Sequence, residues 1–216
     1  MEASPNFSIN GPGEGVSGAA ARKFGKEGFS VGLISRDPEK ITALVEELRG
    51  NGVHVFIANA EVANTNQLKT AIDTLKSQLG KINTLLYNAA FIKEKNILKE
   101  DSASLLDSFK VDVGGALESV KLLLPDLEEE EGAILITGSA LSVNPAAIYG
   151  ALSIGKAGVR SLALQLHESL KSKNIYVGTL TIAGYVQPES ESHSPNLLAD
   201  SFWEMYQKRE FAEVVK

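Results

Sequence analysis

Four glycines cluster in the sequence FSINGPGEGVSG, which spans Phe7–Gly18. A short apolar run precedes them, and an Ala-rich pattern with helical spacing follows. Glycine lets the backbone approach a ligand closely, and the free N–H groups at the start of a helix attract phosphate. The stretch therefore predicts a strand, a turn and a helix that bind a dinucleotide diphosphate. An ordinary tight turn is the alternative.

Two overlapping glycine patterns fit this turn. Gly13-x-Gly15-x-x-Gly18 satisfies the dinucleotide fingerprint, and a second pattern beginning at Gly11 has Ser17 where its last glycine would stand. We predict diphosphate contacts from Gly11, Gly13, Gly15 and Val16. Glu14 places a negative charge beside the expected diphosphate, and Ser17 is expected to narrow the loop.

Ser35 and Arg36 follow the next apolar stretch, about 20 residues beyond the glycines, where a Rossmann fold recognises the adenosine ribose. An acidic residue there would hold the 2′-hydroxyl of NAD, whereas an arginine accommodates the 2′-phosphate of NADP. The pair therefore predicts NADP, with NAD the weaker alternative. Asp37 is interpreted as a helix N-cap before Pro38.

Strand and helix patterns alternate along the whole chain. The sequence predicts a doubly wound parallel sheet of the Rossmann type, with three α/β/α layers, in a single domain spanning 1–216 with a tail at 1–5. Ligands of such sheets bind beyond the carboxyl ends of the strands. Expected strands cover 29–35, 53–58, 82–87, 133–137 and 175–182, and expected helices cover 15–27, 38–50, 65–79, 103–124 (closed by Pro125) and 151–171.

Composition excludes several function classes. The net charge of −6 and the pI near 5.2 argue against nucleic-acid and anionic-membrane surfaces, which need clustered Lys and Arg. There is no cysteine for disulfides or thiolate chemistry, and no apolar run approaches the roughly 18 residues of a membrane span. His54, His167 and His193 lack metal-ligand spacing, so no metal is expected. The prediction is a cytoplasmic protein that acts on a small molecule.

The chain carries, in this order, the motifs NGPGEGVSG, LISRDPEK, NAEV, LLYNAA, ILITGSA, KAGV and TIAGYV. This order resembles the short-chain dehydrogenase/reductase family from about residue 6 to 188. The resemblance implies an NADP(H)-dependent oxidoreductase that transfers a hydride to or from a small carbonyl, alcohol or activated alkene. It also implies further cofactor contacts from Glu61, Val62, Asn88, Ala89, Lys156, Ala183, Gly184 and Val186.

The catalytic half departs from the family pattern. The resemblance places the carbonyl-binding serine at Ser139 and the ribose-binding lysine at Lys156, where its charge would lower the pKa of a tyrosine. The family's tyrosine falls on Leu152, which has no proton to give, and its asparagine falls on Asp112, whose carboxylate could pair with Lys156. Tyr149 gives a Y-x6-K spacing similar to that of bacterial enoyl-carrier-protein reductases.

Two functional hypotheses follow. In the first, Ser139, Tyr149, Lys156 and Asp112 form the catalytic site of a reductase. In the second, the chain is a catalytically silent relative that binds NADP(H) as a redox sensor or scaffold. Residues 188–200 are a candidate substrate loop, and Trp203, Met205 and Tyr206 are interpreted as helix packing rather than as a substrate patch. The resemblance implies that the helices near 103–124 and 151–171 are the pair through which the protein forms a homodimer or homotetramer, with an intramolecular core role for their apolar residues as the alternative.

Overall fold

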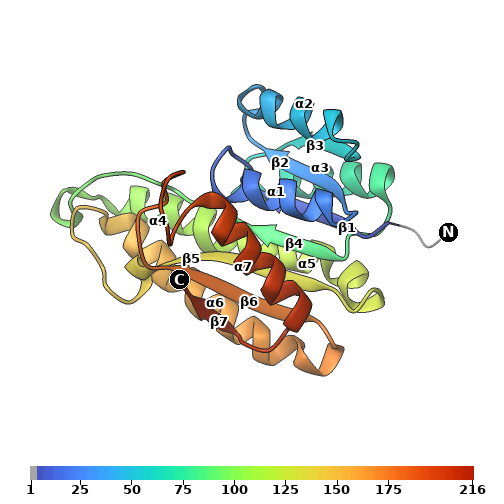
Figure 1. The fold of residues 1–216 in the computed structure, drawn as a ribbon. Helices are drawn as coiled ribbons and strands as arrows, with labels where there is room; N and C mark the ends of the chain where they lie inside the picture. The colour runs from blue at the N-terminus through green and yellow to red at the C-terminus, as the bar shows by residue number, and fades with distance from the viewer. Residues whose placement is uncertain (1–3) are drawn as a thin grey trace.

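The computed structural model describes residues 4–216, which form one seven-stranded parallel sheet with helices on both faces (Figure 1). The strand order is β3-β2-β1-β4-β5-β6-β7. The strands are β1 (Asn6–Asn10), β2 (Ser30–Ser35), β3 (Val55–Asn59), β4 (Thr84–Tyr87), β5 (Ala133–Ser139), β6 (Tyr176–Ile182) and β7 (Glu213–Val215). The doubly wound Rossmann architecture predicted from the sequence is confirmed.

The α-helices connect successive strands. They are α1 (Val16–Lys26), α2 (Thr42–Gly50), α3 (Thr65–Leu79), α4 (Ser102–Phe109), α5 (Gly115–Glu129), α6 (Gly150–Leu170) and α7 (Pro195–Lys208). Short 3₁₀ turns cover Pro38–Ile41, Ile97–Lys99, Ala140–Ser142 and Lys171–Lys173, and a π-helical turn, Lys110–Gly114, joins α4 to α5. None of the helices within residues 4–216 has the length and apolarity needed to cross a bilayer.

Two hydrophobic cores, one on each face of the sheet, hold these elements. One core contains residues of α1, α2 and α7, and the other contains residues of α3, α5 and α6. In the first core, Phe7 stacks on Phe24 at 4.1 Å between ring centroids, and Trp203 and Tyr206 of α7 meet Phe24 edge-on. The packing interpretation of the C-terminal aromatic residues is therefore confirmed.

The order of the strands reverses at β1, which pairs with β2 on one side and with β4 on the other. The chain continues from β1 to a helix on one face of the sheet, α1, and from β4 to a helix on the other face, α5. A crevice therefore opens beyond the carboxyl ends of these two strands. Two backbone hydrogen bonds join the segments that border it: Gly11 N donates to the Ile34 carbonyl at 3.1 Å, and Asn88 N donates to the Asn10 carbonyl at 2.9 Å. The fold thus brings three separate loops to one edge.

The predicted helix over 103–124 is in fact three segments, α4, the π-helical turn and α5. Pro125 lies inside α5 rather than ending it. Leu123 and Leu127 are fully buried on either side of the proline, and the Asp126 carboxylate accepts a hydrogen bond from the Ile82 backbone N–H at 3.0 Å. Tertiary contacts therefore offset the helix-breaking cost of proline, about 3 kcal/mol.

The C-terminal region also differs from the prediction. The candidate substrate loop at 188–200 ends at Ser194, because Ser194 is the N-cap of α7 and Pro195 occupies its first turn. Strand β7 was not predicted, since three residues, EVV, are too short for a periodic signal.

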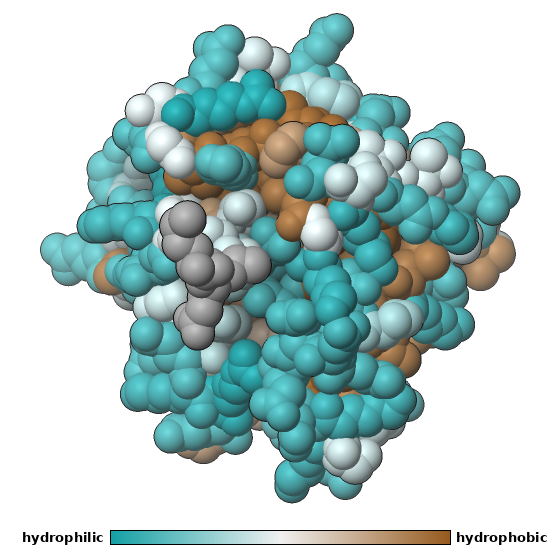
Figure 2. Space-filling view, turned by 90° about the vertical axis from the view of Figure 1, so that its right-hand side faces the viewer, coloured by the Kyte–Doolittle hydropathy of each residue, from teal (hydrophilic) through white to brown (hydrophobic). Residues whose placement is uncertain are grey.

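The face of the molecule shown in Figure 2 is mostly hydrophilic, with apolar side chains gathered in patches between polar ones.

Candidate cofactor and catalytic site

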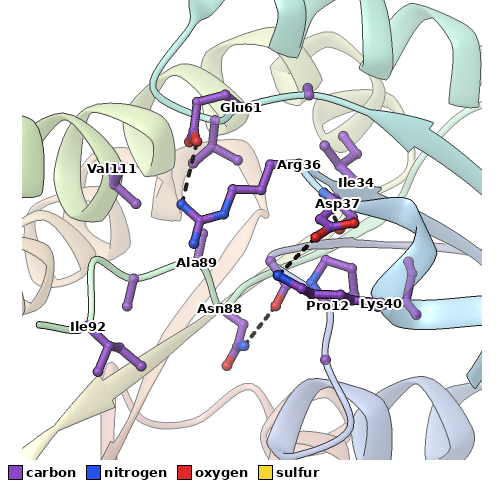
Figure 3. Close-up of a pocket in the computed structure, with 17 residues that line it drawn as sticks. Pro12, Ile34, Arg36, Asp37, Lys40, Glu61, Asn88, Ala89, Ile92 and Val111 are labelled. Carbon is purple, nitrogen blue, oxygen red and sulfur yellow. Dashed lines mark hydrogen bonds and ion pairs between the residues drawn. The ribbon is translucent and has the colours of Figure 1, made fainter.

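A cavity of about 350 Å³ lies beyond the carboxyl ends of β1, β2 and β4 (Figure 3). Of the predicted cofactor-binding residues, those that line it are Gly11, Gly13, Ser35, Arg36, Glu61, Val62, Asn88 and Ala89. The sequence reasoning missed other lining residues, among them Pro12, Ile34, Lys40, Ile41, Ala60, Ile92 and Val111. The fold thus brings most of the first half of the predicted site to one cavity, whereas the predicted contacts Gly15 and Val16 are not among the lining residues.

The glycines of the loop between β1 and α1 have distinct structural roles. Gly11 has a φ of +81°, and a Cβ there would lie 2.5 Å from the Ala89 Cα. A Cβ at Gly18 would lie 2.5 Å from the Gly13 carbonyl oxygen, so α1 packs directly on the loop. Within residues 4–216, no heavy atom beyond the glycine itself and its two chain neighbours lies within 4 Å of a Cβ built at Gly13 or Gly15. The loop therefore leaves its outer side open to a ligand, and residues of both glycine patterns shape it.

Ser17 and Asn88 fix the inner side of this loop. The Ser17 hydroxyl donates to the Gly11 carbonyl at 3.3 Å, as expected for a residue that narrows the loop. The Asn88 side-chain amide donates to the same carbonyl at 2.9 Å (Figure 3). Both donors occupy the one carbonyl, so the loop is held in place before any ligand arrives.

Arg36 stands at the end of β2 on the rim of the cavity, with 71% of its side chain exposed. Its guanidinium reaches toward Glu61, 3.7 Å away (Figure 3). Lys40 lies on the same rim and pairs with the Asp37 carboxylate at 2.9 Å. Two cations therefore border this end of the cavity, each beside a carboxylate that an anionic ligand group could replace.

The N-cap interpretation of Asp37 is wrong in one respect. Asp37 does precede the 3₁₀ turn Pro38–Ile41, but its side chain makes no capping hydrogen bond. Its carboxylate instead pairs with Lys40, and its backbone N–H donates to the Ser35 hydroxyl at 3.1 Å. The reason is that a 3₁₀ turn intervenes and α2 begins only at Thr42.

Ser139 is the last residue of β5, at the carboxyl edge where the resemblance placed a carbonyl-binding group. Its Oγ accepts a hydrogen bond from the Leu141 backbone N–H at 3.2 Å. A hydroxyl that accepts in this way still has its proton to donate. Ser139 can therefore donate to a substrate oxygen.

Lys156 lies in α6 with only 8% of the residue exposed. Its ammonium donates to the Thr137 carbonyl oxygen of β5 at 2.8 Å. Burial lowers the pKa of Lys156, and the nearby Asp112 carboxylate opposes this shift. The predicted ribose-binding lysine is thus directed at the sheet, and it is not among the residues that line the cavity.

Asp112 lies in the π-helical turn and is almost fully buried. Its carboxylate accepts one hydrogen bond from the Phe91 backbone N–H at 2.8 Å and another from the Ser108 hydroxyl at 3.0 Å. Burial raises the pKa of Asp112, while these hydrogen bonds and the charge of Lys156 oppose the rise. The expected direct ion pair with Lys156 is not among those formed within residues 4–216, since Asp112 is satisfied by other donors.

Leu152 and Tyr149 flank the start of α6. Leu152 is buried in the helix, whereas Tyr149 immediately precedes the helix, with φ −116° and ψ 48°. The expectation that α6 begins after Tyr149 is therefore confirmed. The Tyr149 backbone forms a parallel bridge with Lys95, and Ile97 N donates to the Ala147 carbonyl at 2.8 Å. These contacts join the loop before α6 to the loop after β4, and the role of Tyr149 as a proton donor stays a prediction.

Ala183, Gly184 and Val186 follow β6 and do not line the cavity. The imidazole of His193 lies against Gly184, where a Cβ would be 2.7 Å from the ring. His193 is therefore a packing residue of this turn rather than a simple surface histidine. Within residues 4–216, no group of three or more His, Cys, Asp or Glu side chains could hold a metal ion.

A family model described as short chain dehydrogenase matches residues 7–195. The chain is 28% identical over 158 residues to a tropinone reductase-like protein of Erythroxylum coca, covering 73% of this chain and 61% of that protein. It is 26% identical over 210 residues to a 3-oxoacyl-(acyl-carrier-protein) reductase of Staphylococcus epidermidis, covering 95% of this chain and 84% of that one.

Solved structures share the fold. The L-sorbose reductase of Gluconobacter frateurii, complexed with NADPH and L-sorbose, superposes with a TM-score of 0.90 at 18% identity, covering 99% of this chain and 95% of that one. An alcohol dehydrogenase of Thermococcus sibiricus, complexed with 5-hydroxy-NADP, gives 0.87 at 17% identity, covering 98% and 95%. Together with the family match and the glycine loop, these findings show that the chain belongs to the short-chain dehydrogenase family of NAD(P)-dependent oxidoreductases.

Proposed function

We propose that this chain prefers NADP(H) and transfers a hydride to or from a small carbonyl, alcohol or activated alkene. The observation that carries the cofactor preference is Arg36, which stands on the rim of the cavity that the glycine loop borders. Lys40 adds a second cation on the same rim. Charge-assisted hydrogen bonds of this kind favour a phosphate over a hydroxyl.

The residues present fit a dinucleotide. The outer side of Gly13 and Gly15 is open, α1 begins directly after the loop, and small residues at Ala89 and Ala90 line the opposite wall. The helix N-terminus and the loop N–H groups would hold the diphosphate. When bound, the nicotinamide ring supplies or accepts the hydride.

The chain itself must position the substrate and provide a proton. The Ser139 hydroxyl accepts a hydrogen bond from the Leu141 N–H and keeps its own proton, which supports a role as donor to the substrate oxygen. Tyr149 is the candidate acid, because it precedes α6 and the family position holds Leu152. Tyr149→Phe is expected to remove nearly all turnover and to spare NADPH affinity, measured by NADPH oxidation over a panel of carbonyls and enones. Turnover equal to that of the wild type would make Tyr149 structural.

Titration of NADPH and NADH by nicotinamide fluorescence tests the cofactor proposal. Arg36→Ala is expected to weaken NADPH about 10-fold to 100-fold, from the loss of one or two charge-assisted bonds at an exposed site, and to change NADH little. Arg49→Ala is the matched control, because Arg49 donates to the Val55 carbonyl and does not line the cavity. Equal losses of both cofactors in Arg36→Ala would refute the preference.

The alternative function is that of a catalytically silent relative that binds NADP(H) as a redox sensor or scaffold. Two observations favour it. Leu152 offers no proton, and Lys156 donates to the sheet rather than toward the cavity. Leu152→Tyr tests this reading: if the wild type oxidises NADPH with no substrate of the panel and the variant does, the scaffold is competent and only the acid is missing. Turnover by the wild type would refute it.

We also infer a homodimer or homotetramer that forms through α4 and α6. Leu106, Phe109 and Ile154 on these helices are 61%, 44% and 46% exposed. Exposed large apolar side chains on adjacent helices are typical of contacts between subunits. Light scattering of the wild type and of Phe109→Glu tests this, with loss of the oligomer expected in the variant. The cytoplasmic location stays a prediction.

A further inference from the structure

Glu14 is an unusual residue for a loop that binds a diphosphate. It lies between the two open glycines, Gly13 and Gly15, and 56% of its side chain is exposed. A carboxylate at this place repels the two negative charges of a diphosphate, and at an exposed site the repulsion extends over a Debye length of about 10 Å. A positive side chain beside Glu14 would reduce this repulsion.

Arg22, in the second turn of α1, is the positive side chain that lies beside Glu14 in the structure. Its Nη2 lies 3.0 Å from the Glu14 carboxylate. The same guanidinium makes a fork to Glu47 of α2, with Nε at 2.7 Å from one oxygen and Nη2 at 2.6 Å from the other. The bidentate geometry fixes the guanidinium in place, so that its charge stays beside Glu14.

We infer that Arg22 is a positioning residue for dinucleotide binding: it holds the Glu14 carboxylate away from the diphosphate and offsets part of its charge. This inference rests on the proposed function. It assigns Glu47 a supporting role, since Glu47 anchors Arg22 from the neighbouring helix. None of the three residues lines the cavity, and we expect none of them to touch the ligand.

The contact also explains why a basic residue occurs in the middle of α1. The adjacent Lys23 belongs to a different cluster, in which it lies 3.1 Å from Glu27 and 3.3 Å from Asp200 of α7. Lys23 therefore carries the same charge on the same helix without a contact to the glycine loop. It provides a matched control for any general effect of charge on binding.

The test is NADPH titration by fluorescence for the wild type, Arg22→Met, Lys23→Met, and Arg22→Met combined with Glu14→Gln. Methionine retains the alkyl packing of Arg22 and removes only its charge and hydrogen bonds. Arg22→Met is expected to weaken NADPH about tenfold at low ionic strength, equivalent to about 1.4 kcal/mol, and less in about 0.5 M salt. Lys23→Met is expected to bind like the wild type.

The double variant separates charge from fold. If Glu14 causes the loss, Glu14→Gln restores the affinity of Arg22→Met to within about threefold of the wild type, a coupling that independent sites do not show. Circular dichroism melts establish that each variant is folded. A folded Arg22→Met that binds like the wild type, or that Glu14→Gln does not rescue, overturns the inference alone. A wild type that binds no dinucleotide refutes the proposed function and this inference with it.

Discussion

Gly11→Ala is expected to destabilise the whole fold, in contrast with the neighbouring Gly13. The backbone at Gly11 has φ +81°, and this left-handed conformation costs a residue with a side chain about 1–2 kcal/mol. The new Cβ would also lie 2.5 Å from the Ala89 Cα and 2.6 Å from the Ala89 N, and such overpacking costs about 1–3 kcal/mol. The expected loss is therefore about 2–5 kcal/mol, a large share of the roughly 5–15 kcal/mol that keeps a domain folded.

Urea unfolding measures this loss, with the fluorescence of Trp203, the one tryptophan of the chain, as the signal. The midpoint of Gly11→Ala should fall by about 1–2 M urea, given a slope of about 2–3 kcal/mol per M for a chain of this size. Gly13→Ala is the control, because no heavy atom lies within 4 Å of its Cβ, and its stability should change by less than about 0.5 kcal/mol. Equal midpoints for Gly11→Ala and the wild type would refute the assignment of Gly11 as a packing contact of the loop.

Three further outcomes are expected. Gly13→Val should abolish dinucleotide binding in a fluorescence titration and leave the free energy of unfolding within about 0.5 kcal/mol of the wild-type value, since its side chain enters open space beside the cavity; unchanged binding would mean that the stretch is only a turn. Gly155→Ala should cost about 1–3 kcal/mol, because its Cβ would overlap the Asp112 carboxylate, and Asp112→Ala in the same chain should lessen that cost. Glu213→Gln should cost about 1 kcal/mol at pH 7, since the hydrogen bond from Arg160 holds the pKa of Glu213 below the ordinary value of a glutamate. A carboxyl with a lowered pKa stabilises the fold above its unfolded pKa and stops doing so as the pH falls through the lowered value, so the difference between Glu213→Gln and the wild type should vanish in acid; a constant difference from pH 7 to pH 3 would contradict this.

The adenosine half of the site could be predicted because its signals are local. A glycine cluster between a strand and a helix, and an arginine directly after the next strand, each sit within a few residues of the element that positions them. Lys40 could have been found in the same way, since it lies one turn beyond Arg36 on a segment with Pro38 at its start. It was missed because the 3₁₀ turn was interpreted as the first turn of α2.

The predicted catalytic residues depend on contacts between distant segments, and these contacts cannot be read from the sequence. The motif letters place Lys156 near a cofactor, but its partner is Thr137 of β5, and this becomes visible only when α6 is packed on the sheet. Asp112 is likewise defined by its position in a π-helical turn, which has no sequence signal of its own. Pro125 shows the same limit, because the buried contacts of Leu123 and Leu127 let α5 continue through the proline to Glu129.

The hydrogen bond from Lys156 to Thr137 has a consequence for how such proteins are classified. A lysine that bonds the central sheet joins α6 to β5, whether or not a reaction takes place beside it. Selection for stability and selection for catalysis would then leave the same letter at this position. Surveys that count the lysine of a family motif as a sign of activity would score this chain as active on a residue whose amine is withdrawn from solvent. For chains like this one, the residue at position 152, here Leu152, is the more informative one to compare when activity is judged from sequence.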